Sequence, residues 1–196
     1  MPLSRVQELP AISGSSLTNM GMTRISLSAP GSAVTEIDIS LSKTSHDFYK
    51  LFGFLDNTSD NVNAYFRFLT DAGNPVGGGS DYHYSRHKTE GSADAGSSDN
   101  AHGFIIWTPT IGNSTNETGT GFEMLIGPCN STSFPIQMQG QAFAHDEGGQ
   151  ASLNVFSGGF VSKKGGTDGF GGIRLYFESG NIGANSFVYA YGINKT

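Results

Sequence analysis

Four side chains of metal-binding types lie close together in the middle of the chain: Asp81, His83, His87 and His102. On a helix, the four-residue spacing of His83 and His87 would place both rings on one face, where they could hold zinc. The segment around them is polar and aromatic and reads as a strand, in which four residues span about 13 Å. Two histidines so far apart do not share an ion, so we interpret them as surface or packing residues.

A second group of candidates consists of carboxylates expected in loops: Asp56, Asp60, Asp94 and Asp99. Hard cations such as calcium prefer oxygen ligands of this kind. The segment from Asp56 to Asp60 lacks the glycine and the distal glutamate of an EF-hand loop, so turn-forming roles are favoured. We predict no resident metal, with a calcium ion held between loops as the alternative.

Groups that could act in catalysis are scattered along the sequence. A glycosidase needs two carboxylates at a defined separation, and the sequence fixes no such pair. The carboxylates that could supply such a pair are Glu117 and Glu123, or Asp146 and Glu147. The single cysteine, Cys129, has no charged neighbour that would lower the pKa of its thiol, so we interpret it as a buried filler. We therefore predict a protein that is not an enzyme and uses no cofactor.

Three aromatic residues are candidates for contacts with a ligand or another subunit. Trp107 lies in an apolar run and is expected in the core, whereas Tyr82 and Tyr84 lie on a polar segment. Flat aromatic rings stack on sugars, and tyrosine is enriched at protein interfaces. Tyr82 and Tyr84 therefore remain candidates for either a glycan contact or a subunit contact.

The composition indicates turn-rich β structure. The 196 residues include 28 glycines and only 14% charged residues, against about 25% in an average globular chain. The net charge of -6 argues against a broad nucleic-acid-binding surface, which needs clustered lysine and arginine. A run of about 18 apolar residues is absent from the sequence, so no membrane span is expected.

Alternating or fully apolar segments predict roughly ten strands and no long helix. The predicted strands are 34–41, 48–55, 62–69, 81–87, 104–108, 121–126, 134–144, 151–161, 173–177 and 186–193. Short strands at this spacing predict an all-β, jelly-roll-like antiparallel sandwich. The strand 48–55 is apolar at most positions, which is typical of a strand covered on both faces.

The chain divides into two zones. Residues 1–33 are rich in serine, glycine and proline and are predicted to form an extended arm, which packs on its own sheet or on a neighbouring subunit. Residues 34–196 are predicted to form the sandwich. The longest unstructured stretch is expected at residues 88–100, a length at which loops are often functional or interfacial.

Two segments carry a resemblance to a known group of proteins. Residues 171–193 read GGIRLYFESGNIGANSFVYAYGI, in which two alternating runs flank a Gly-Asn turn. Residues 60–84 read DNVNAYFRFLTDAGNPVGGGSDYHY, a strand ending in Arg-Phe, a polar turn and an aromatic strand. Both resemble structural proteins of tailed bacteriophages, and the similar order of parts extends in outline over residues 46–193.

The resemblance implies a structural protein of the virion. Within that group we expect a capsid decoration (cement) protein that assembles as a homotrimer and contacts the major capsid protein through the arm. The alternative is a tail-fibre or spike module that binds host-surface glycans through the loops at residues 88–100 and 111–121. A polysaccharide-degrading enzyme is the least favoured interpretation.

Overall fold

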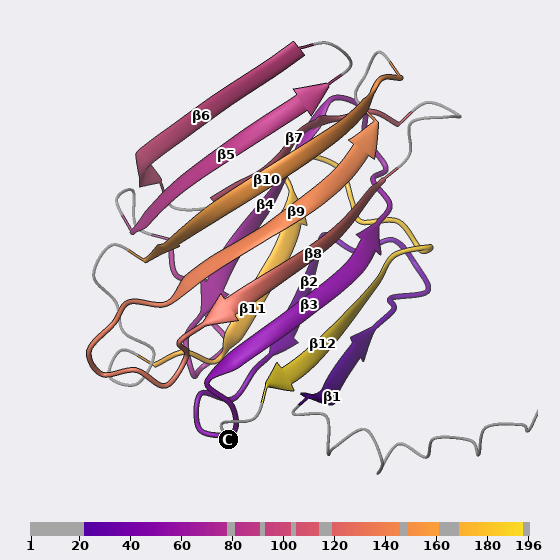
Figure 1. The fold of residues 1–196 in the computed structure, drawn as a ribbon. Helices are drawn as coiled ribbons and strands as arrows, with labels where there is room; N and C mark the ends of the chain where they lie inside the picture. The colour runs from indigo at the N-terminus through magenta and orange to yellow at the C-terminus, as the bar shows by residue number, and fades with distance from the viewer. Residues whose placement is uncertain are drawn as a thin grey trace, which may run out of the picture.

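The computed structural model describes residues 22–77, 81–90, 93–102, 105–113, 119–145, 149–160 and 169–193; of residues 94, 99–102 and 105–110 it describes the backbone alone. This part of the chain contains strands and connections and no helix (Figure 1). The strands are β1 (Met22–Ser28), β2 (Glu36–Ser40), β3 (Phe48–Leu55), β4 (Val62–Leu69), β5 (Tyr82–Glu90), β6 (Ala93–His102), β7 (Ile105–Ile111), β8 (Thr120–Gly127), β9 (Gln137–His145), β10 (Ala151–Phe160), β11 (Gly172–Phe177) and β12 (Phe187–Ile193).

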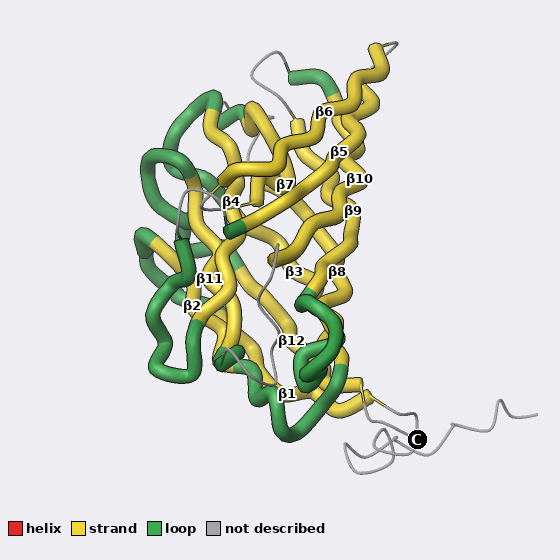
Figure 2. Tube along the Cα trace, turned by 90° about the vertical axis from the view of Figure 1, so that its left-hand side faces the viewer, coloured by secondary structure: helices red, strands yellow, loops and turns green. Residues whose placement is uncertain are grey.

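The strands form two antiparallel sheets that pack face to face. The large sheet has eight strands in the order β1-β12-β3-β8-β9-β10-β5-β6, and the small sheet has four in the order β2-β11-β4-β7. Figure 2 shows the two sheets as separate layers, with β2, β11 and β4 in one and β3, β8, β9 and β10 in the other. The predicted all-β sandwich is confirmed.

Eight of the strands follow the jelly-roll pattern. In chain order these are β1, β2, β3, β4, β7, β8, β11 and β12. In the large sheet, β1, β12, β3 and β8 lie side by side in that order. The small sheet consists of β2, β11, β4 and β7. Six of the seven connections between them therefore cross from one sheet to the other, which is the double Greek key of a jelly roll.

Two hairpins extend the large sheet beyond this jelly roll. The hairpin β5–β6 is inserted in the sequence between β4 and β7, and the hairpin β9–β10 is inserted between β8 and β11. They meet edge to edge, because β10 pairs with β5 along its length and Ser157 lies opposite Ser85. The expectation of an unstructured loop at residues 88–100 is wrong, since these residues belong to β5 and β6 apart from residues 91 and 92, which lie outside the description.

The core lies between the sheets and is formed by every second side chain of the strands. Phe68 on β4 is fully buried at its centre, and its ring lies 4.6 Å from that of Phe160 and 4.8 Å from that of Phe66. Tyr82 stacks on Phe160 with ring centroids 5.1 Å apart. Most of the aromatic side chains inside the sandwich are thereby joined in one cluster between the small sheet and the hairpin extension.

The N-terminal zone contributes a strand to the sandwich. β1 pairs antiparallel with β12, from Met22 opposite Ile193 to Ser28 opposite Val188. Residues 22–28 of the predicted arm thus form an edge strand of the large sheet, so this part of the arm packs on its own sheet. Residues 1–21 lie outside the described residues.

Candidate functional site

The two tyrosines predicted as surface contacts point into the core. Tyr82 is fully buried and Tyr84 is 8% exposed, because they occupy the inward positions of β5. The Tyr82 hydroxyl donates to the carbonyl of Val76 (2.8 Å) and accepts from the backbone N–H of Phe68 (2.9 Å). Burial raises the pKa of the Tyr82 phenol. Tyr82 is therefore a core residue whose ring is out of reach of a glycan or another subunit, whereas Tyr84 borders the groove described below, and a contact there stays a prediction.

Among the side chains that the structure describes, the histidines and acidic residues do not converge on one site. His83 and His87 lie on the outer face of the large sheet, four residues apart on β5. In the part of the chain that the structure describes, no group of three His, Cys, Asp or Glu side chains is placed to hold a metal ion. Trp107 lies on β7 and Asp94 and Asp99 on β6, and their side chains lie outside the description, as do Glu117, Asp146 and Glu147 altogether.

The loop aspartates fix the turns at one end of the sandwich. One carboxylate oxygen of Asp60 accepts from the backbone N–H groups of Asn61 and Asn113, each at 3.0 Å. Asp56 accepts a bond from the side-chain amide of Asn185 (3.2 Å). These are turn-forming roles, in which the carboxylates satisfy neighbouring donors.

Cys129 is fully buried just after the cis Gly127–Pro128 peptide bond. Burial, with a smaller contribution from Asp47, raises the pKa of its thiol far above the ordinary value. The thiol therefore stays protonated at neutral pH and is a poor nucleophile, which agrees with its interpretation as a filler.

The outer face of the large sheet carries a row of exposed and half-buried aromatic rings on β3 and β12. We call these residues the aromatic stripe: Phe52, Phe54, Phe187, Tyr189 and Tyr191. Phe52 lies between two tyrosines, with centroid distances of 5.3 Å to Tyr189 and 5.5 Å to Tyr191. Phe187 contacts Tyr189 (5.8 Å) and lies 6.5 Å from Phe54. Phe52 is 37% and Phe187 38% exposed, so the rings shield one another only in part.

Exposed aliphatic side chains on the edge strand β1 lie beside the stripe. Leu27 lies opposite Tyr189 in the register and is 49% exposed, and Ile25 beside it is also exposed. The sequence predicts that β3 is covered on both faces, but none of the described elements lies over this outer face (Figure 1). The expected cover is thus missing from the described part of a single chain.

A groove lies next to the stripe, over β8, β9, β10 and β5. It has a volume of about 1010 Å³ and its polar side chains come from outward positions, among them Gln137, Gln139, Ser157 and Ser85. The backbone itself forms part of the floor at Gly159, where a Cβ atom would lie 2.5 Å from the carbonyl oxygen of Ile136. We call this depression the polar groove. The sequence signal for it is the run of outward glutamines on β9, which our sequence interpretation did not single out.

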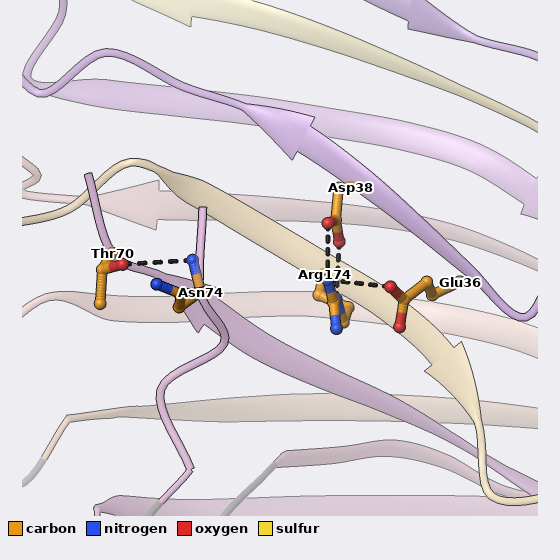
Figure 3. Close-up of polar contacts among 5 residues, drawn as sticks. All are labelled: Glu36, Asp38, Thr70, Asn74 and Arg174. Atoms are coloured by element: carbon orange, nitrogen blue, oxygen red, sulfur yellow. Dashed lines mark hydrogen bonds and ion pairs between the residues drawn. The ribbon is translucent and has the colours of Figure 1, made fainter. Parts of the chain in front are cut away.

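The outer face of the small sheet carries polar contacts of its own, although the buried Tyr176 hydroxyl has no hydrogen-bond partner among the described residues. Arg174 binds both carboxylate oxygens of Asp38, each at 2.7 Å, and also Glu36 at 2.9 Å (Figure 3). These contacts raise the pKa of Arg174, with the hydrogen bond to Asp38 as the largest cause. The guanidinium of Arg67 lies over the ring of Tyr176 at 5.3 Å. In the nearby turn the Thr70 hydroxyl accepts from the backbone N–H of Asn74, also drawn in Figure 3.

No family model, curated protein or solved structure matches this chain. Among the described residues there is also no helix that could cross a membrane.

Proposed function

We propose that this protein is a structural component of a bacteriophage virion, a capsid decoration (cement) protein that assembles as a homotrimer. The observation that carries the proposal is the aromatic stripe on a strand that is apolar on both faces. Stacked rings exposed over two neighbouring strands of a monomer are typical of a surface that another protein covers. The resemblance of residues 60–84 and 171–193 to phage structural proteins supplies the virion context.

The charges on this face favour sister copies as the cover. The chain carries a net charge of -6, so most surfaces of two copies repel each other. Next to the stripe, Lys50 is paired with Glu123 at 3.1 Å, so these two charges cancel. Copies can therefore approach through this face with little repulsion. A closed ring of three is the arrangement that we expect from the resemblance and from the preference of oligomers for closed symmetry.

The contact with the major capsid protein is assigned to the segment before β1. β1 lies at the edge of the large sheet beside the stripe, so the described part of the chain begins at the rim of the proposed subunit interface. An extended segment of the length of residues 1–21 reaches about 70 Å, enough to pass onto a neighbouring protein. The proposal thus separates self-assembly on the stripe from attachment through the N-terminal segment.

Self-assembly is tested by light scattering coupled to size-exclusion chromatography. The wild type is expected as a trimer and Phe52→Asp as a monomer, because a buried unpaired carboxylate in the interface is strongly unfavourable. Phe134→Asp is the matched control, since Phe134 is 66% exposed in the connection between β8 and β9 and lies outside the stripe. A monomeric wild type, or a Phe52→Asp variant that remains trimeric, contradicts the proposal.

Attachment is tested by mixing purified protein with phage particles that lack it and imaging the capsids. Deleting residues 2–21 leaves β1 in place, so the variant is expected to fold and trimerise but not to decorate. Normal decoration by the shortened chain would remove the role assigned to the N-terminal segment, and failure of the full-length chain to bind any capsid would remove the decoration function.

A further inference from the structure

The polar groove has a regular arrangement of uncharged hydrogen-bonding groups across four strands. The register places Gln139 on β9 opposite Ser157 on β10, Ser157 opposite Ser85 on β5, and Ser85 opposite Ser98 on β6. Neighbouring strands lie about 4.8 Å apart, so these side chains form a row across the sheet. Gln137 stands two positions before Gln139 on the same face of β9, about 7 Å away.

These groups are available to a ligand. The side chains of Gln137, Gln139, Ser157 and Ser85 form no hydrogen bond with other protein groups in the described part of the chain, and all four are exposed. An amide presents both donors and an acceptor, and a hydroxyl presents a donor and two lone pairs. The row can therefore bind a partner that offers many groups of both kinds.

The lining also restricts the charge of the partner. Among the described residues that line the groove there is no aspartate, glutamate, lysine or arginine. His83 also lines the groove, but a charged ligand would find no carboxylate, ammonium or guanidinium group there. Phe48, which is 38% exposed, and Pro128 and Pro135 supply apolar surface at one end. Such surface suits the apolar face of a sugar ring, as aromatic rings do in general.

We propose that the polar groove is a binding site for a neutral glycan, an oligosaccharide or polysaccharide chain without acidic or amino groups. A glycan presents dense uncharged hydroxyl groups that donate and accept, together with apolar ring faces, which matches both parts of the lining. The site binds and does not hydrolyse, because no two carboxylates flank it among the residues described. The inference is independent of the proposed virion function and places recognition on the sheet face instead of the loops.

The test is native gel electrophoresis in the presence of soluble neutral polysaccharides: dextran, mannan, galactan and a β-glucan, with alginate and heparin as acidic probes. We expect at least one neutral polymer to retard the wild-type protein and the acidic polymers to leave its mobility unchanged. Calorimetric titration with oligosaccharides of the retarding polymer then gives the dissociation constant.

Two variants connect binding to the groove. Gln139→Ala removes the central amide and is expected to weaken binding at least tenfold, and Ser157→Trp fills the groove and is expected to abolish it. Asn74→Ala is the matched control, because it removes an exposed amide from the turn between β4 and β5 and should bind as the wild type does. Equal unfolding midpoints for all the variants show that each chain is folded.

The inference is overturned if no neutral polymer retards the protein, if the acidic polymers bind as well as the neutral ones, or if Gln139→Ala and Ser157→Trp bind as the control does. A synthetic peptide of residues 1–21 provides a second probe. Saturable binding of this peptide that Ser157→Trp abolishes, without glycan binding, would assign the groove to the chain's own N-terminal segment and overturn the glycan site. None of these outcomes depends on trimer formation or capsid attachment, so the two proposals fail separately.

Discussion

The outer faces of the two sheets belong to the same sandwich but differ in how many of their polar and aromatic side chains find partners within the chain. On the small sheet, Arg174 is saturated by Asp38 and Glu36, and Tyr176 is covered by Arg67. On the large sheet, the aromatic stripe and the polar groove leave rings, amides and hydroxyls exposed. A face whose groups bind one another has little left for a partner, so the difference directs the search for function to the large sheet.

The comparison also separates stability from interaction. The ion pairs of Arg174 on the small sheet and the hydrogen bonds of Tyr82 in the core are made within one chain, so their loss should appear in the free energy of unfolding. Contacts on the outer face of the large sheet are incomplete, so changes there should affect association or binding more than folding. Matched substitutions of the same residue type on the two sides test this separation.

The largest difference is expected between two phenylalanines. Phe68→Ala should lower the free energy of unfolding by about 3–5 kcal/mol, because it leaves a cavity between the sheets. Phe52→Ala should lower it by about 1 kcal/mol, since its ring is already partly in water. Urea unfolding of dilute, monomeric protein measures both. Similar losses at the two positions would break the comparison.

Two tyrosines provide a test of the hydroxyl group alone. Tyr82→Phe should cost about 1–3 kcal/mol of unfolding free energy, because the buried N–H of Phe68 and carbonyl of Val76 lose their partner. Tyr189→Phe on the stripe should change it by less than about 0.5 kcal/mol. Thermal unfolding of the variants side by side is sufficient. A neutral Tyr82→Phe would mean that another group can satisfy these backbone atoms.

A smaller difference is expected between the two ion pairs. Arg174→Ala should cost about 1 kcal/mol, because the bidentate contact is well formed although its carboxylates remain partly in solvent. Lys50→Ala should cost a few tenths of a kcal/mol, since Lys50 and Glu123 are each more than 40% exposed. Repeating the unfolding curves at high salt should reduce both losses. An equal or larger loss at Lys50 would contradict the assignment of stability to the small sheet.

The smallest effect concerns the titration of Tyr176. Burial raises its pKa to about 12 from an ordinary value of 10.0. The unfolded chain therefore loses this proton first, so the contribution of Tyr176 to stability is intact below pH 10.0 and falls as the pH rises toward 12. Burial also raises the pKa of Tyr49 to about 12, so absorbance titration should show two phenolates near pH 12 in the wild type and one in Tyr176→Phe. Appearance of the Tyr176 phenolate near pH 10 would show that water reaches this side of the small sheet.

Sequence alone predicted the fold class and several strands. The bounds of β3 and β4 agree with the predicted ranges, because their apolar residues alternate or fill both faces. β6 was missed because its sequence, ADAGSSDNAH, has no large apolar side chain and a low propensity for strands. It becomes a strand through its backbone pairing with β5, which the sequence does not encode locally.

The candidate surfaces were less predictable. The apolar pattern of β3 predicted a cover on both faces, whereas the described part of one chain leaves its outer face open. The polarity of β5 suggested that Tyr82 and Tyr84 are exposed, whereas the alternation of that strand turns both rings inward. The row through Gln139, Ser157 and Ser85 depends on the pairing of β10 with β5. These strands belong to hairpins that are far apart in the sequence, so local sequence patterns do not reveal the row.

The pairing of β10 with β5 makes the two hairpins dependent on each other. A chain shortened by both hairpins would still contain every strand of the jelly roll. A chain shortened by β5–β6 alone would leave the full length of β10 as a bare rim of unpaired N–H and C=O groups, open to strand exchange and fibre growth. The two insertions are therefore expected to be gained, lost and exchanged between relatives as one unit.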